Sequence, residues 1–63
     1  MKAIEDYDKA ILIDPKTHGY YFNRGISHAK TKNLKKAVED LSEAIALDMK
    51  NSFYYYQRGL FLI

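Results

Sequence analysis

Apolar residues recur at intervals of three and four along most of the chain, which predicts amphipathic helices. The first helix is expected at residues 2–13, where charged residues occupy the opposite side. A helix at roughly 18–31 shows two apolar stripes, which predicts contacts with two neighbouring helices. The clearest pattern predicts a helix at 34–47, with apolar positions at Leu34, Ala37, Val38, Leu41, Ala44 and Ile45. A fourth helix is expected from residue 52 onward.

Short polar stretches separate these predicted helices. Pro15 cannot continue a helix and moves Asp14 out of the helical conformation, so the chain is expected to turn there. Residues that commonly begin helices follow each turn. The expected N-caps are Thr17, Asn33 and either Asn51 or Ser52.

The chain also repeats itself at an interval of 34 residues. Of the 29 positions that can be compared, 12 are identical. The identical pairs include Lys2/Lys36, Ala3/Ala37, Glu5/Glu39, Asp6/Asp40, Tyr21/Tyr55, Arg24/Arg58 and Gly25/Gly59. A fixed period of this size is typical of solenoids, in which each unit buries its apolar face only against its neighbours.

Length and charge exclude several classes of protein. A chain of 63 residues allows one small domain, which buries only about 60% of the surface exposed in its unfolded form. There is no cysteine, and ten basic residues intermix with eight acidic ones, which is not the footprint of a nucleic-acid-binding protein. No apolar run reaches the roughly 20 residues that span a bilayer, and no signal peptide is recognisable. We therefore expect an intracellular, cytoplasmic protein with neither nucleic acid nor membrane as partner.

The order of large and small residues within one period carries a family resemblance. Tyr21 at the first aromatic position, Gly25, the small residues Ala37 and Ala44, and Leu41 between them resemble the tetratricopeptide repeat. The resemblance implies an all-α fold, a fragment of a right-handed superhelical solenoid built from antiparallel helix-turn-helix repeats.

In the phase of that family, the single domain 1–63 divides into three parts. Residues 2–17 resemble the second helix of a preceding repeat, 18–51 a complete repeat, and 52–63 the first helix of a following repeat. The sequence departs from the family pattern at four positions. Arg24 and Arg58 stand where leucine is usual, His28 where tyrosine is usual, and Met49 where proline is usual.

The resemblance and the apolar pattern together predict which residues pack between helices. Mid-helix glycine is unfavourable by about 0.8–1 kcal/mol relative to alanine, so Gly25 is expected to allow close approach of a neighbouring helix. The expected packing residues are Ala3, Tyr7, Ala10, Tyr21, Gly25, Ala37, Leu41, Ala44, Tyr55 and Gly59. Arg24 and Arg58 are expected to pair with an acidic residue of an adjacent helix, such as Asp6 or Asp40.

The resemblance further implies a concave groove lined by the first helix of each repeat. The residues expected there are Gly19, Phe22, Asn23, Ile26, Ala29, Lys30, Phe53, Tyr56, Gln57, Leu60 and Ile63. The predicted function is a non-catalytic scaffold that binds a peptide of a partner protein through hydrophobic anchors. Alternatively, these side chains pack on a neighbouring repeat. A further alternative is self-association, head to tail or by swapping, through helices whose apolar stripes lack a partner.

Other chemistries fit the sequence less well. Asn23 matches the carboxylate clamp of some tetratricopeptide proteins, but Phe53 and Gln57 occupy positions where that clamp needs basic residues. His18 and His28 lie about 15 Å apart on one helix, so they do not share a metal ion. We expect no cofactor, no metal and no catalytic residues, since no nucleophile or phosphate loop accompanies the acidic residues. Lysines around residues 30–36 leave an RNA-binding helical repeat as a minor alternative.

Overall fold

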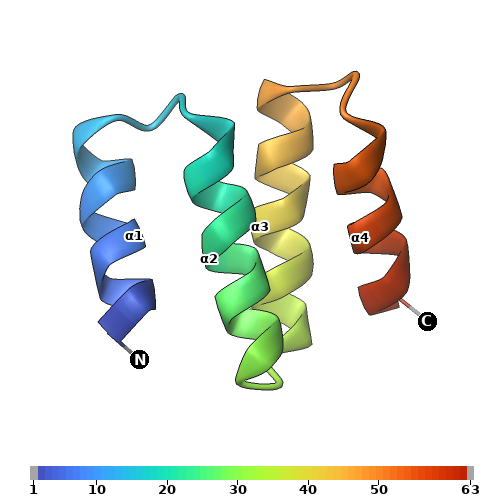
Figure 1. Ribbon diagram of the computed structural model, residues 1–63, viewed down its shortest axis with the longest axis horizontal. Helices are drawn as coiled ribbons and strands as arrows, with labels where there is room; N and C mark the ends of the chain where they lie inside the picture. Colours follow the sequence, from blue (N-terminus) through green and yellow to red (C-terminus); the bar gives the residue numbers. More distant parts are fainter. Residues whose placement is uncertain (1, 63) are drawn as a thin grey trace.

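The computed structural model describes residues 2–62, which form four helices: α1 (Lys2–Ile13), α2 (His18–Lys30), α3 (Leu34–Leu47) and α4 (Ser52–Leu62). Figure 1 shows that successive helices run in opposite directions and lie side by side. The molecule is flat, with principal extents of 29 × 26 × 13 Å. The all-α architecture predicted from the sequence is confirmed.

The first turn is built around Asp14 and Pro15. α1 ends at Ile13, and the Asp14 carboxylate accepts a hydrogen bond from the Thr17 hydroxyl. Thr17 stands at the N-cap of α2, but its side chain makes no capping hydrogen bond. The prediction that its side chain caps this helix is therefore wrong. The hydroxyl is instead engaged within the turn. Tyr21 of α2 also reaches the turn, since its hydroxyl donates to the Pro15 carbonyl at 2.9 Å.

The two later turns have the expected caps. Asn33 Oδ1 accepts a hydrogen bond from the Lys36 backbone N–H at 3.3 Å, and Asn51 Oδ1 accepts one from the Tyr54 N–H at 3.2 Å. Lys32 in the α2–α3 turn has φ of 66°, the left-handed conformation that often follows a helix. Each asparagine thus satisfies a backbone N–H in the first turn of the helix that follows it.

The core lies where α3 packs between α2 and α4. Ala37, Leu41 and Ala44 are fully buried, and Ile45 is 7% exposed. The aromatic residue that joins them from α4 is Tyr54, at 6% exposure. Tyr55, predicted to pack because it matches Tyr21 in the repeat, is 44% exposed. No helix among residues 2–62 covers this side of α4, so packing of Tyr55 is not seen within the described residues and stays a prediction.

The two mid-helix glycines have different surroundings. A Cβ atom placed on Gly25 would lie 3.2 Å from the Ala37 carbonyl oxygen and 3.2 Å from Asp40 Cβ. The close approach of α2 and α3 predicted at Gly25 is therefore present. At Gly59, no described atom lies within 4 Å of such a Cβ. Packing at Gly59 is thus not seen within the described part of the chain.

α1 is the least buried helix of the described residues. It packs against α2, but none of its residues is fully buried, and Leu12 and Ile13 are each 84% exposed. Ala3, Tyr7 and Ala10, expected as packing residues, are half-buried. None of the four helices is both long enough and apolar enough to cross a membrane.

Candidate functional site

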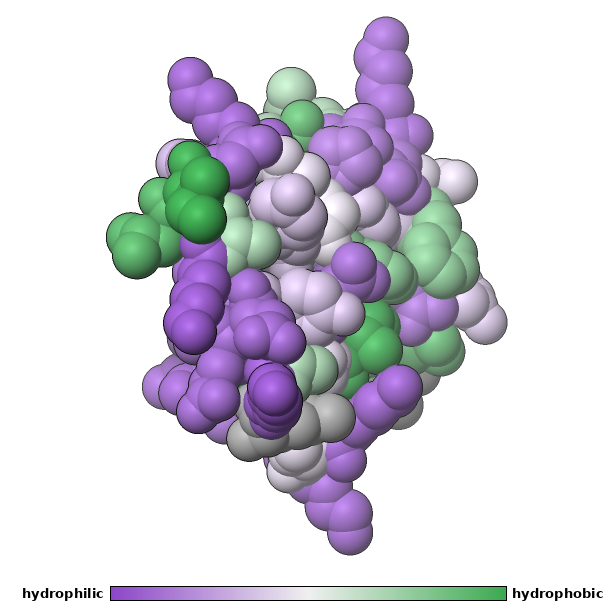
Figure 2. Space-filling view, turned by 60° about the vertical axis from the view of Figure 1, so that its left-hand side comes forward, coloured by the Kyte–Doolittle hydropathy of each residue, from purple (hydrophilic) through white to green (hydrophobic). Residues whose placement is uncertain are grey.

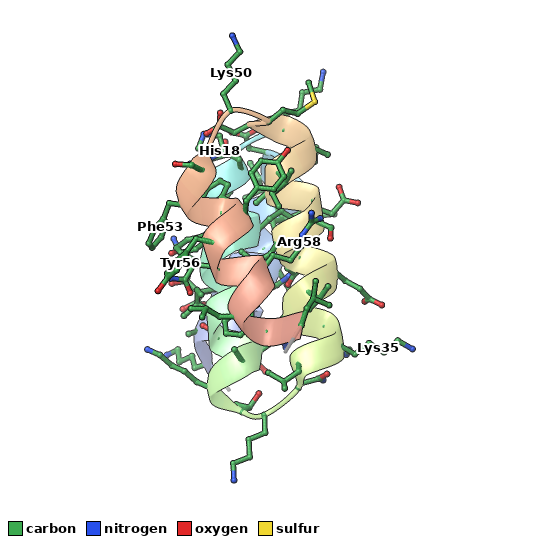
Figure 3. All side chains as sticks on the ribbon, turned by 90° about the vertical axis from the view of Figure 1, so that its right-hand side faces the viewer. His18, Lys35, Lys50, Phe53, Tyr56 and Arg58 are labelled. Atoms are coloured by element: carbon green, nitrogen blue, oxygen red, sulfur yellow. The ribbon has the colours of Figure 1, made fainter. Side chains whose placement is uncertain are left out.

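An aromatic surface lies on the side of the molecule that α2 and α4 share. Figure 3 shows Phe53 and Tyr56 projecting from α4 to that side, whereas Lys35 of α3 projects to the opposite side. Phe53 is 52% exposed, Tyr56 63% and Leu60 46%. Their exposure makes these three side chains accessible to a second molecule. We call the surface formed by Phe22, Phe53, Tyr56 and Leu60 the aromatic face.

Phe22 connects the aromatic face to the core. Its ring stacks on Tyr54 with centroids 4.9 Å apart, and lies 5.5 Å from the ring of Phe53. Phe22 also packs against the buried cluster that contains Ala44 and Ile45. The sequence predicted Phe22 as a groove residue, but the side chain is half-buried and has a structural role as well. Substitution of Phe22 is therefore expected to disturb the core.

The other predicted groove residues surround this face with mixed exposure. Gly19, Ile26, Ala29 and Gln57 are half-buried, and Asn23 and Lys30 are exposed. Ile63, also predicted there, lies outside the described residues. The exposed polar residues are an amide and an amine, and no acidic residue belongs to the predicted set.

His18, Tyr54 and Asp48 form a polar contact at the start of α2. His18 Nδ1 and the Tyr54 hydroxyl share a hydrogen bond at 2.7 Å, and His18 Nε2 lies 3.6 Å from the Asp48 carboxylate. Burial raises the pKa of Tyr54 above its usual value, with a further contribution from the negative charge of Asp48. This contact joins α2 to α4, so it helps hold the helices that carry the aromatic face.

Arg24 of α2 bonds to two other helices at once. Its Nε and Nη2 donate to the two oxygens of Asp40 at 2.8 and 2.7 Å, and its Nη1 donates to Asp8 of α1 at 2.7 Å. The hydrogen bond to Asp40 raises the pKa of Arg24 above its ordinary value despite partial burial. His28 Nε2 lies 3.6 Å from the same Asp40 carboxylate. Of the two partners suggested by the sequence, Asp40 is correct, whereas Asp8 takes the place expected for Asp6.

Arg58 of α4 repeats part of this arrangement. Its Nη1 donates to the Ser42 hydroxyl of α3 at 3.2 Å, and its guanidinium lies 5.6 Å from the Tyr55 ring centroid. In the described chain, no carboxylate forms an ion pair with Arg58. The acidic partner predicted for Arg58, such as Asp6 or Asp40, is therefore not found among the described residues. Ser42 lies one period after Asp8, so a hydroxyl stands where Arg24 has a carboxylate partner.

Two clefts lie away from the aromatic face. A polar cleft of about 280 Å³ is lined by Ile4 and Asp8 of α1, Arg24 and His28 of α2, and Lys36, Glu39 and Asp40 of α3. An apolar cleft of about 360 Å³ is lined by Leu34, Lys35, Val38 and Glu39 of α3 and by Phe61 and Leu62 of α4. The charged groups of the polar cleft include the paired Arg24 and Asp40. Their chemistry is that of a structural ion pair.

A comparison with family models decides the classification. The model of the tetratricopeptide repeat matches residues 18–51, just over half of the chain. The chain belongs to the tetratricopeptide repeat family. No curated protein and no solved structure matches it.

The matched tetratricopeptide repeat consists of α2, α3 and the turn that follows α3. It therefore contains Arg24, Gly25 and Asp40, the residues that hold α2 against α3. Tetratricopeptide repeats generally mediate protein–protein interaction and act as non-catalytic scaffolds. In this tetratricopeptide chain, no group of three or more His, Cys, Asp or Glu residues within 2–62 is placed to hold a metal ion.

Proposed function

We propose that the aromatic face binds a segment of a partner protein that presents hydrophobic side chains. The observation that supports this proposal is the exposure of Phe53, Tyr56 and Leu60 on one side of α4, next to Phe22 of α2. Contiguous exposed apolar surface on a small protein marks an interaction site more often than an accident of folding. The face lies on helices rather than loops, so the backbone positions that carry its side chains are fixed relative to one another.

The chemistry of the face suggests the chemistry of the partner. Aromatic side chains with a polar end, such as Tyr56, are enriched among residues that dominate binding energy. The predicted polar neighbours, Asn23, Lys30 and Gln57, supply donors at the edge for backbone carbonyls or acidic side chains. An amphipathic helix or an extended segment with apolar anchors at regular spacing satisfies both requirements.

Selection from a phage-displayed library of random peptides tests this proposal. Peptides that bind the unmodified chain are measured against Phe53→Ser and Tyr56→Ser, because both residues are more than half exposed. Each substitution is expected to weaken binding at least about tenfold, since loss of a hot-spot side chain exceeds about 2 kcal/mol. Circular dichroism is expected to show unchanged helicity for both.

Leu12→Ser is the matched control for removal of an exposed apolar side chain. Leu12 is 84% exposed on α1, away from the aromatic face. It is expected to leave peptide binding unchanged. Failure to select any peptide contradicts the proposal, as does equal binding by the Tyr56→Ser chain.

A further inference from the structure

α4 presents a second surface, distinct from the aromatic face, that reproduces one side of the α2–α3 junction. Adjacent residues on a helix differ by about 100° in direction, so Tyr55 and Tyr56 face different sides. Arg58 lies over the Tyr55 ring at 5.6 Å, just as Arg24 lies over the Tyr21 ring at 5.8 Å. The arginine of α4 is thus already held in the arrangement that its counterpart in α2 has in the assembled repeat.

The hydrogen bonds of the two arginines agree in part. Nη1 of Arg24 donates to Asp8, and Nη1 of Arg58 donates to Ser42, the residue one period later. Nε and Nη2 of Arg24 are taken by the carboxylate of Asp40 on the adjacent helix. Nε and Nη2 of Arg58 have no acceptor among the described residues, so this edge of the guanidinium is available for a carboxylate.

The surroundings of the two glycines also show that α4 lacks the neighbour that α2 has among the described residues. α3 approaches Gly25 so closely that the Ala37 carbonyl oxygen and Asp40 Cβ lie 3.2 Å from the position of a Cβ. The corresponding space beside Gly59 holds no described atom within 4 Å. Gly59 and Arg58 together therefore form a seat for a helix that carries a small residue and, three residues later, a carboxylate.

α1 carries these residues at the required spacing. Asp6 is exposed and forms no ion pair within residues 2–62. It follows a small residue by three positions, as Asp40 does on α3. The α1 counterparts of Ala37, Asp40 and Leu41 are Ala3, Asp6 and Tyr7.

The two clefts support the same pairing. On one side, the polar cleft is lined by Lys36, Glu39 and Asp40 of α3. The residues at the equivalent positions of α1 are identical: Lys2, Glu5 and Asp6. The apolar cleft occupies the equivalent place one period later, because Val38 and Leu62 correspond to Ile4 and His28. No third helix of the described chain lines the apolar cleft. An α1 helix from a second copy of the chain, placed in this cleft, would line its third side.

We propose that α1 of a second copy of this chain docks on α4, with Asp6 bound to Arg58 as Asp40 is bound to Arg24. On α1, Asp8 rather than Asp6 contacts Arg24, so the α1–α2 ion pair leaves the Asp6 carboxylate available to a second copy. Figure 2 shows hydrophilic residues over much of the side on which α1 lies, with hydrophobic patches among them, so both charge pairing and apolar area are offered to the contact. The contact joins two different surfaces, so it extends head to tail and grows with concentration.

Charge reversal tests the proposal directly on the 63-residue chain. Analytical ultracentrifugation over a wide concentration range is expected to show assembly of the unmodified protein. Arg58→Glu and Asp6→Arg, each alone, place like charges opposite one another and are expected to raise the concentration needed for assembly at least about tenfold. An equimolar mixture of the two variants restores opposite charges at every junction, and is expected to assemble like the unmodified chain.

The rescue separates a direct ion pair from misfolding. Assembly regained in the mixture, with helicity unchanged in each variant, supports the pairing. An unmodified chain that remains monomeric at all concentrations overturns it, and then the seat on α4 belongs to another occupant. Assembly that persists in both single variants, or that the mixture does not restore, also overturns it.

A further pair of variants separates this proposal from the proposed function. Tyr56→Ser is expected to lose peptide binding but to assemble normally, because it alters the aromatic face. Arg58→Glu is expected to lose assembly but to bind selected peptides normally. If Tyr56→Ser abolishes assembly, the copies associate through the aromatic face and the proposed α1–α4 contact is wrong.

Discussion

Helices α1 and α3 share nearly the same five residues in their first half, Lys2–Asp6 and Lys36–Asp40, yet they differ sharply in burial. α3 lies between α2 and α4 and buries five residues, whereas α1 packs mainly on α2 and buries none among those described. The local sequence is shared, so it does not explain the difference. Burial in this fold depends on how many neighbours a helix has, as expected where each unit is stabilised by adjacent units.

The largest expected effect comes from the centre of α3. Leu41→Ala removes a fully buried side chain, and the resulting cavity is expected to lower the free energy of unfolding by about 3 kcal/mol. Tyr7→Ala, at the equivalent position of α1, is expected to lower it by only about 1 kcal/mol because Tyr7 is half-buried. Urea unfolding followed by circular dichroism measures both. Equal losses would show that α1 is as well packed in solution as α3.

A smaller difference is expected for the two aspartates. Asp40→Asn leaves Arg24 without its bidentate partner in a half-buried place, and a loss of about 2 kcal/mol in unfolding free energy is expected. Asp6→Asn removes an exposed charge, so its effect is expected to stay within about 0.5 kcal/mol. The measurement is urea unfolding at a concentration low enough to keep the chain monomeric. A large effect of Asp6→Asn in the monomer would mean that Asp6 has an intramolecular role.

The two glycines are expected to respond in opposite directions. Gly25→Ala places a methyl group 3.2 Å from a backbone oxygen, which outweighs the gain in helix propensity and destabilises the protein by about 1 kcal/mol. Gly59→Ala meets no described atom and is expected to stabilise the monomer by up to about 1 kcal/mol.

The same Gly59→Ala chain is expected to assemble less readily, because the methyl group fills the seat proposed for α1. Thermal unfolding and ultracentrifugation of this one variant therefore change in opposite directions. An increase in both stability and assembly would contradict the proposed contact at Gly59.

The smallest expected effect concerns pH and the buried tyrosine of α4. The pKa of Tyr54 in the folded protein lies above the ordinary value of 10.0, so the unfolded chain loses this proton first. Its contribution to stability is constant below pH 10 and is lost as pH rises through the folded pKa. The urea midpoint is therefore expected to fall more steeply above pH 10 in the unmodified protein than in Tyr54→Phe. Tyr55→Phe, at an exposed neighbour, is the control and is expected to follow the unmodified protein.

The helices and their ends were predictable from the sequence because they depend on local chemistry. Apolar spacing set the four helices, Pro15 ended α1, and Asn33 capped α3 as expected. The repeat also located the close approach at Gly25. These features need no information about distant neighbours.

Features that depend on which neighbour is present were less predictable. The repeat assigned Tyr55 to the packing set, but the core receives Tyr54 because the side of α4 that carries Tyr55 has no covering helix among the described residues. Likewise, Phe22 was predicted to line the groove, and its stacking on Tyr54 places part of it in the core. The spacing of 16 residues between Arg24 and both Asp8 and Asp40 is a signal that identifies the two partners of this arginine correctly.

The double attachment of Arg24 has a consequence for motion. α1 has no buried residue, so lifting it from α2 should be among the least costly openings of the molecule, and its backbone amides should exchange hydrogen faster than those of α3. Such an opening breaks the bond between Arg24 and Asp8 but leaves the bond between Arg24 and Asp40 intact. The repeat of α2 and α3 is then expected to remain folded while α1 moves about the turn at Pro15. When α1 packs on α2 again, the bond between Arg24 and Asp8 forms again. Arg24 thus makes one ion pair that persists through this opening, with Asp40, and one that breaks and forms again, with Asp8.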